Sequence, residues 1–254
     1  MGAREARPPV EGRSAAPPPL TGRPHRRATI PGSSEVELEA QDFALKLTTY
    51  VVLLFSLSVH ESAHGWMAYR MGDDTAVSQG RVSLNPLVHI DPIGTVLIPL
   101  IQIFGPVGIP LMGWAKPTPV GAHNFRNLAR GHILVAGAGP VSNIVLATLC
   151  TAALFVTLRV GLSPEIELPV RAIIETGVVM NIALAIFNLV PLPPLDGSWV
   201  ASWGLPRPIA EKYDRVMEPY GSWILLILFM TGVLGFVIRP FINAVVRVVE
   251  RLVF

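Results

Sequence analysis

The sequence predicts an all-α polytopic membrane protein, a bundle of about five to six transmembrane helices with a small membrane-associated strand or loop region. Composition is the first reason: of 254 residues, 51% are hydrophobic and 15% are charged, and the mean hydropathy is +0.50. Few soluble domains are this apolar. The second reason is that the apolar residues form runs near bilayer-crossing length, at 43–59, 133–160, 173–192 and 223–238.

Residues 1–42 differ from the rest of the chain. They are rich in Pro, Arg, Gly and Ala, contain six arginines and no apolar stretch, and end in an acidic run. Such a segment cannot bury enough apolar surface to fold. We therefore expect a disordered Arg/Pro-rich tail over 1–42, a transmembrane domain over 43–238 and an amphipathic C-terminal helix over 239–254.

The first half of the transmembrane domain is expected to contain one long helix and an irregular region. The helix begins near Phe43 and ends at Met71, because a glycine and two aspartates follow. Strand or loop structure is expected from Thr75 to Asp91, where Asn-Pro and Asp-Pro pairs indicate turns. Residues 93–112 are apolar but contain three prolines, so a kinked span and a re-entrant hairpin both fit.

The second half is expected to contain three more spans. One helix follows the polar loop 113–130 and runs to about Val160, and the next runs from about Val170 to Pro191 after a short loop. The chain is then polar from Asp196 to Glu218, spans again from Tyr220 to Ile238, and ends in an amphipathic stretch that we expect along the membrane surface.

Charge and cysteine content exclude some classes of protein. The net charge of +2 arises from the tail and from basic loops, so no nucleic-acid surface is indicated. The single cysteine, Cys150, excludes an internal disulfide and a multi-cysteine metal site.

The segment His60-Glu61-Ser62-Ala63-His64 matches the pattern HExxH. On a helix, residues four apart share one face, so both imidazoles can reach one zinc ion. Glu61 then lies beside that ion, where it can take a proton from a water molecule whose pKa the metal lowers to roughly 7. The pattern is typical of metalloproteases. Two histidines and a glutamate after so long an apolar run are energetically costly in a membrane, which indicates that they are functional.

A catalytic zinc ion takes three protein ligands, so a third must come from elsewhere in the chain. Asp196 is the strongest candidate, because it ends a segment in which three prolines interrupt an apolar helix and free the backbone to aim a carboxylate into the bundle. The other candidates are His89, His123, His132, Glu165 and Glu175.

Taken together, the motifs of the chain resemble those of the site-2 protease family of intramembrane zinc metalloproteases, in its compact bacterial and archaeal branch without a PDZ domain. The segments that carry the resemblance are His60–His64, Gly139–Asn143, Asn188–Pro191 with Asp196-Gly197, 85–95 and 113–120. The resemblance covers roughly residues 43–237.

The resemblance implies one Zn²⁺ per chain, with His60, His64 and Asp196 as ligands and Glu61 as the catalytic base. It also implies that Asn143 and Asn188 assist catalysis by donating hydrogen bonds to the substrate backbone or to the developing oxyanion. His89 is expected either to orient a ligand or to pack within its loop.

The expected function is therefore intramembrane zinc-dependent hydrolysis of peptide bonds in or near transmembrane segments of other membrane proteins, as in regulated intramembrane proteolysis. The expected partners are such substrates and the lipid bilayer, and no nucleic acid. Basic loops predict a bacterial inner membrane protein with its active site toward the cytoplasm. The alternatives are a catalytically silent scaffold with a structural zinc, against which the intact Glu61 argues, and a transporter, for which the sequence shows neither repeats nor several intramembrane carboxylates.

Overall fold

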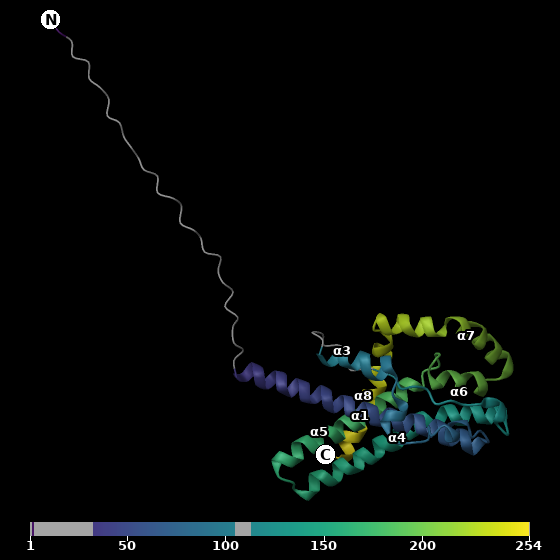
Figure 1. The fold of residues 1–254 in the computed structure, drawn as a ribbon, viewed down its shortest axis with the longest axis horizontal. Helices are drawn as coiled ribbons and strands as arrows, with labels where there is room; N and C mark the ends of the chain where they lie inside the picture. The colour runs from purple at the N-terminus through teal and green to yellow at the C-terminus, as the bar shows by residue number, and fades with distance from the viewer. Residues whose placement is uncertain (1, 3–32, 105–112, 254) are drawn as a thin grey trace.

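The computed structural model describes residue 2, residues 33–104 and residues 113–253 (Figure 1). The described residues form helices joined by turns and loops and contain no strand. This confirms the predicted all-α class. The part of the predicted tail that precedes residue 33, apart from residue 2, lies outside the described residues.

The helix α1 (Ser33–Met71) is 39 residues long, and it carries the HExxH pattern near its C-terminal end. It begins ten residues before the predicted start near Phe43 and ends at the predicted residue. In Figure 1 its N-terminal part extends away from the other helices, whereas its C-terminal part lies among them. The helix therefore enters the bundle where the histidines are.

The end of α1 is fixed by Gly72 and Asp73. Gly72 has φ of +113°, which only glycine adopts readily, so the helix stops there. The Asp73 carboxylate is fully buried and accepts hydrogen bonds from Thr75 Oγ1 at 2.5 Å, from Asn124 Nδ2 at 2.8 Å and from the Gly121 N–H at 2.7 Å. It thereby ties the end of α1 to the loop before α4.

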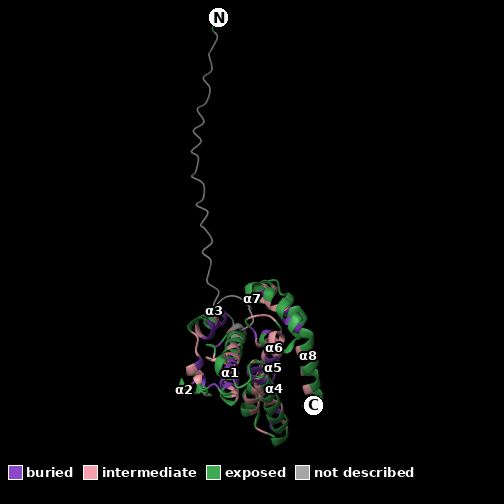
Figure 2. Ribbon diagram, turned by 90° about the vertical axis from the view of Figure 1, so that its right-hand side faces the viewer, coloured by how far each residue is buried: buried purple, intermediate pink, exposed green. Residues whose placement is uncertain are grey.

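The helices α4 (Leu128–Val160) and α5 (Pro164–Asn188) form an antiparallel hairpin, and α4 also packs against α1 and α6. Gly161, in the left-handed conformation, ends α4, and Pro164 begins α5. Buried residues gather where α1, α4, α5 and α6 meet, while α7 and α8 are mostly exposed (Figure 2). The core thus lies beside the C-terminal half of α1.

Of the two alternatives predicted for the region between α1 and α4, strand or loop, the described residues contain loops with short helices and no strand. This region holds a short helix α2 (Thr75–Ser78), a 3-10 helix η1 (Pro86–His89), a π-helical turn η2 (Pro92–Leu97) and α3 (Ile98–Phe104). The Asn85 and Asp91 side chains accept hydrogen bonds from N–H groups that follow them, and they cap η1 and η2. Side chains that hydrogen-bond to nearby backbone N–H groups in this way stabilise turns instead of the backbone pairing of a strand.

Together η2 and α3 are roughly 20 Å long, too short to span a bilayer by themselves, and residues 105–112 lie outside the described residues.

The C-terminal third also differs from prediction. The helix α6 (Asp196–Gly204) is followed by α7 (Arg207–Met230) and α8 (Val233–Val253), so the span predicted over Tyr220–Ile238 is broken. The break lies at Gly232, whose φ of +75° ends α7, and the two helices meet at an angle of 77°. On α8, Ile242, Val246 and Val249 pack against a buried cluster that includes Val178.

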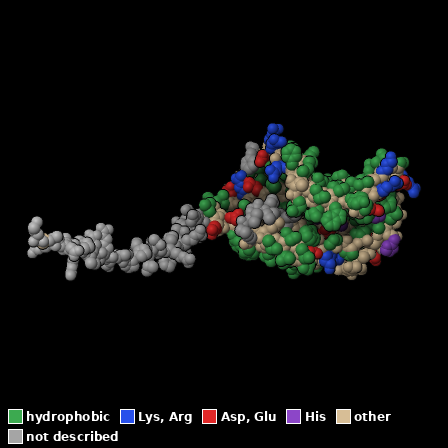
Figure 3. All heavy atoms as spheres, turned by 90° about the horizontal axis from the view of Figure 1, so that it is seen from above, with side chains coloured by type: hydrophobic (Ala, Val, Ile, Leu, Met, Phe, Trp, Pro, Cys, Tyr) green, Lys and Arg blue, Asp and Glu red, His purple; other side chains and the backbone are tan. Residues whose placement is uncertain are grey.

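Three helices of the described residues are long and apolar enough to cross a membrane, or four if the bent pair α7 and α8 counts as one span. This is fewer than the five to six predicted, because α3 is short and α7 bends into α8. Hydrophobic side chains cover most of the face in Figure 3, and Lys and Arg lie in small groups near its edges. The chain is an integral membrane protein.

We predict that Asp73→Asn destabilises the protein by roughly 2 kcal/mol, because an amide cannot accept from all the donors that surround this carboxylate. Although burial alone would raise it, the hydrogen bonds from Thr75, Asn124 and Gly121 lower the pKa of Asp73 below its ordinary value. A lowered folded-state pKa stabilises the fold above the unfolded value of about 3.9, and this stabilisation is lost as the pH falls through the folded value.

Thermal unfolding in detergent between pH 3 and pH 7, for wild type and Asp73→Asn, measures the effect. The matched control is Asp74→Asn, since Asp74 is exposed and its side chain caps no helix. Equal melting temperatures for the two variants at pH 7 would show that Asp73 does not hold this junction.

Candidate metal centre

The imidazoles of His60 and His64 lie side by side on α1, four residues apart, and both are buried. Their Nε2 atoms are 3.0 Å apart and their rings are nearly perpendicular. The first prediction, that one helical face carries both nitrogens, is confirmed.

The Nδ1 atom of each histidine is occupied. His64 Nδ1 lies 2.7 Å from the Val135 carbonyl oxygen, and His60 Nδ1 lies 2.6 Å from Asn143 Oδ1. A carbonyl oxygen only accepts, so the proton of the neutral His64 ring sits on Nδ1 and the lone pair on Nε2. The same tautomer follows for His60 if Asn143 presents its oxygen.

A buried polar chain fixes that orientation of Asn143. The Gly177 carbonyl accepts from Asn181 Nδ2 at 2.8 Å, which turns Asn181 Oδ1 toward Asn143 Nδ2, also at 2.8 Å. Asn181 Nδ2 donates in addition to Ser56 Oγ at 2.9 Å. Asn143 and Asn181 are almost fully buried. The orientation of a backbone carbonyl on α5 therefore determines which nitrogen of His60 faces the site.

Asp196 reaches the histidines from the turn between α5 and α6. The helix α5 ends at Asn188, and the three prolines predicted to interrupt it lie in the turn that follows. Asp196 begins α6, with its carboxylate oxygens 3.2 Å from His60 Nε2 and 3.4 Å from His64 Nε2. Both of its oxygens thus face the Nε2 atoms of the two histidines.

Within the described residues, His60, His64 and Asp196 form the one group of metal-binding side chains whose donor atoms lie within 4.8 Å of one another. In a tetrahedral zinc site with metal–ligand bonds of about 2.1 Å, the ligand atoms lie roughly 3.4 Å apart. The donor atoms of His60, His64 and Asp196 are 3.0 to 3.4 Å apart. A metal ion between the two Nε2 lone pairs would also give a partner to the buried Asp196 Oδ2, which has no hydrogen bond. The three side chains fit zinc.

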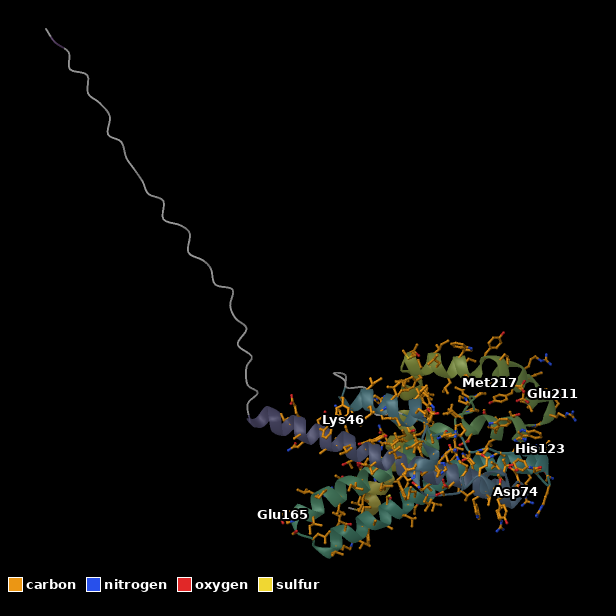
Figure 4. All side chains as sticks on the ribbon, viewed as in Figure 1. Lys46, Asp74, His123, Glu165, Glu211 and Met217 are labelled. Atoms are coloured by element: carbon orange, nitrogen blue, oxygen red, sulfur yellow. The ribbon has the colours of Figure 1, made fainter. Side chains whose placement is uncertain are left out.

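None of the other candidate ligands belongs to this group of donor atoms among the residues that the structure describes. In Figure 4, His123 and Glu165 are at opposite ends of the molecule. His132 lines the cavity and stacks on Trp199 and Trp203. His89 Nε2 lies 2.8 Å from the Ser83 carbonyl in its own loop and 3.4 Å from Ser62 Oγ on α1.

Glu61 is adjacent to the metal-binding group and lines the same cavity. Its Oε2 atom accepts a hydrogen bond of 2.8 Å from the Thr118 N–H, and Thr118 Oγ1 donates to the Glu61 carbonyl at 3.0 Å. The side chain is partly exposed to the cavity. Glu61 can therefore meet a water molecule or a substrate there while one of its oxygens is held in place.

The cavity has a volume of about 810 Å³ and contains the site. Its wall is largely apolar and comes from α1, α4, α5, α6 and the segment 113–125. Representative lining residues are Leu57, Trp114, Phe125, Leu184, Phe187 and Trp199. This volume accommodates several residues of peptide in an apolar setting.

Asn143 and Asn188 occupy different positions. Asn143 lies behind His60, with its oxygen on the imidazole and its nitrogen on Asn181. Asn188 lines the cavity and donates to the Leu184 carbonyl at 3.0 Å. Their donation to a substrate or an oxyanion stays a prediction.

Sequence reasoning did not identify the Val135 carbonyl, Gly139 or Thr118 as parts of the site. A side chain at Gly139 would place its Cβ 2.5 Å from both His60 Cε1 and His64 Nε2. Thr118 belongs to the segment 113–120, whose resemblance to the family was the available signal. A backbone carbonyl such as that of Val135 has no sequence signal.

Known proteins similar to this chain carry zinc metalloprotease names. The chain is 37% identical over 212 residues to "Putative zinc metalloprotease YwhC" of Bacillus subtilis, a match that covers 80% of this chain and 90% of that one. It is 30% identical over 191 residues to "Putative zinc metalloprotease Rip2" of Mycolicibacterium smegmatis, and 27% identical over 187 residues to Rip2 of Mycobacterium tuberculosis. Those two matches cover 72% of this chain and 66% of each relative.

No protein-family model matches the chain, and no solved structure matches it significantly. The relatives' names nevertheless support a metalloprotease, and they agree with the zinc ion that the three side chains fit.

We predict that Gly139→Ala lowers zinc affinity by roughly tenfold or more, because the added methyl displaces imidazoles in a close-packed interior. Gly137→Ala is the matched control, since a Cβ at Gly137 meets nothing within 4 Å. Metal analysis after dialysis against a zinc buffer measures the difference. Equal zinc content in both variants would contradict the close contact at Gly139.

We also predict that Asn143→Ala weakens zinc binding by roughly 10- to 100-fold, because His60 loses the partner that fixes its tautomer and ring orientation. Competition with a chromophoric chelator measures the affinity. The control is Thr148→Ala, which removes an exposed hydroxyl from the same helix. If both variants bind zinc as wild type does, Asn143 does not orient His60.

Proposed function

The chain belongs to the site-2 protease family of zinc metalloproteases, and on that premise we propose that it hydrolyses peptide bonds in or near the transmembrane segments of other membrane proteins. The observation that carries this proposal is the position of the site. His60, Glu61 and His64 lie on α1, a helix able to span the membrane, and face a cavity with a largely apolar wall.

His60, His64 and Asp196 would hold the metal, and all three line the cavity. Zinc bound there would supply Lewis-acid activation of a carbonyl oxygen and would make a nearby water more acidic. Glu61 takes the proton of the attacking water and returns it to the nitrogen of the departing amine. The Thr118 N–H keeps one Glu61 oxygen in place, so the other is available for the proton.

Asn188, on the cavity wall, is proposed to donate a hydrogen bond to the substrate backbone, and Asn143 remains a proposed donor to the developing oxyanion if its amide is released from Asn181. The substrate segment must be extended at the cleaved bond. A helix hides its carbonyls in hydrogen bonds to N–H groups four residues later, so local unwinding precedes attack.

We propose that the active site opens toward the cytoplasmic side of a bacterial inner membrane. Asp74, His123 and Glu211 lie at one end of the molecule, and Lys46 and Glu165 lie toward the other (Figure 4). The segments at the first end are rich in Lys and Arg, as cytoplasmic segments are. They contain Arg70, Arg81, Lys116, Arg126, Arg130, Arg207, Lys212 and Arg215, whereas the connection of α4 to α5 is flanked by Arg159 and Arg171.

We predict that Glu61→Gln keeps its zinc and loses cleavage by roughly 100- to 10,000-fold, as expected when a general base is removed. Asp196→Asn is expected to lose zinc as well as cleavage. Zinc content and cleavage of a panel of single-span substrates in proteoliposomes measure both effects.

Glu165→Gln is the matched control, because it makes the same chemical change at an exposed position at the far end of the bundle. If Glu61→Gln cleaves as fast as this control, the protease mechanism is wrong. Wild type that binds zinc and cleaves nothing favours the silent scaffold.

A further inference from the structure

Arg81 is a buried cation in the loop after α2, and only 7% of its surface is exposed. Among the described residues, no carboxylate lies within ion-pair distance of it. Its Nε atom is buried without a hydrogen-bond partner. Burying a guanidinium without an anion is unfavourable, so the contacts that it does make require an explanation.

Those contacts are two consecutive backbone carbonyls. Arg81 Nη2 donates to the Lys116 oxygen at 2.6 Å and to the Pro117 oxygen at 3.2 Å. Carbonyls are weaker partners for arginine than carboxylates, but the two hydrogens of Nη2 can each meet one of two neighbouring acceptors. Arg81 thus holds the backbone of residues 116–117 from one side.

The next residue along this segment is Thr118, which contacts Glu61. The Thr118 N–H donates to Glu61 Oε2 at 2.8 Å, and its hydroxyl donates to the Glu61 carbonyl. A further bond, from the Lys116 N–H to the His89 carbonyl at 2.9 Å, holds the segment on the η1 loop. The position of the Thr118 amide therefore depends on how residues 116–117 are held.

We propose that Arg81 is a positioning residue for Glu61: by fixing the carbonyls of Lys116 and Pro117, it places the Thr118 N–H where it holds the carboxylate of the base. This inference rests on the proposed function. Arg81 does not line the cavity, so it acts on the reaction through the segment and not by touching the substrate. Displacement of a reacting group by about 1 Å costs on the order of 100-fold in rate.

The test compares full-length Arg81→Gln and Arg81→Lys with wild type. Arg81→Gln is expected to lower kcat by roughly 10- to 100-fold while KM changes by less than about threefold, because the base is misplaced and the cavity is intact. Zinc content should stay at the wild-type level, since no ligand contacts Arg81. Arg81→Lys, which keeps the charge but not the planar fork, is expected to recover part of kcat.

A second readout does not depend on activity. Hydrogen–deuterium exchange of the peptide that contains Thr118 is expected to be faster in Arg81→Gln than in wild type, whereas exchange around His60 is unchanged. The matched control is Arg70→Gln, which removes an exposed arginine from the end of α1.

Three outcomes overturn the inference: Arg81 variants with the kcat of Arg70→Gln, a loss of zinc that parallels the loss of kcat, or unchanged exchange at Thr118. If Arg81→Gln does not fold, Arg81→Lys decides by the same criteria. If wild type cleaves no substrate, the proposed function fails, and the exchange result still shows whether Arg81 fixes the Thr118 amide.

Discussion

The rest of the structure depends on one constraint, that two imidazoles turn their Nε2 atoms to the same point inside an apolar bundle. Each ring achieves this by donating a hydrogen bond from its Nδ1–H to a fixed acceptor, the Val135 carbonyl for His64 and Asn143 Oδ1 for His60. Asn143 in turn is oriented by Asn181, whose amide is held by the Gly177 carbonyl. In a low-dielectric interior each such bond is strong and each missing one is costly, so the polar chain is complete.

The packing of the helices follows from this requirement. The helix α4 supplies the Val135 carbonyl, Asn143 and Gly139, so it must lie against the histidines along several turns. Gly139 allows this approach, because any side chain there would overlap both imidazoles. The prolines after α5 end that helix at the depth of the site, and α6 then begins with Asp196. The third donor thus arrives from a break in a helix.

The loop between α3 and α4 supports the site from the other side. Asp73 ties it to the end of α1, Arg81 holds its backbone at residues 116–117, and Thr118 contacts Glu61. These contacts anchor the loop at several points within a short stretch of sequence. A general base gains from such support, because its carboxylate must stay in one place while the substrate enters. An apolar bundle could not provide it, since hydrocarbon side chains do not orient a carboxylate.

The sequence by itself determined the helical membrane class, the pair of histidines with Glu61, and Asp196 as the strongest third donor. These follow from local rules, namely run length, the spacing of four on a helix and the effect of prolines. Tertiary structure alone decided which groups accept from each imidazole and that residue 139 lies too close to the histidines for a side chain. It also decided that Thr118 contacts Glu61 and that Arg81 contacts the two residues before Thr118. Finally, it decided the bend between α7 and α8, and it decided for turns over a strand in residues 75–91. Such contacts join residues far apart in the chain, often through backbone carbonyls, which every residue carries and which no sequence pattern can distinguish.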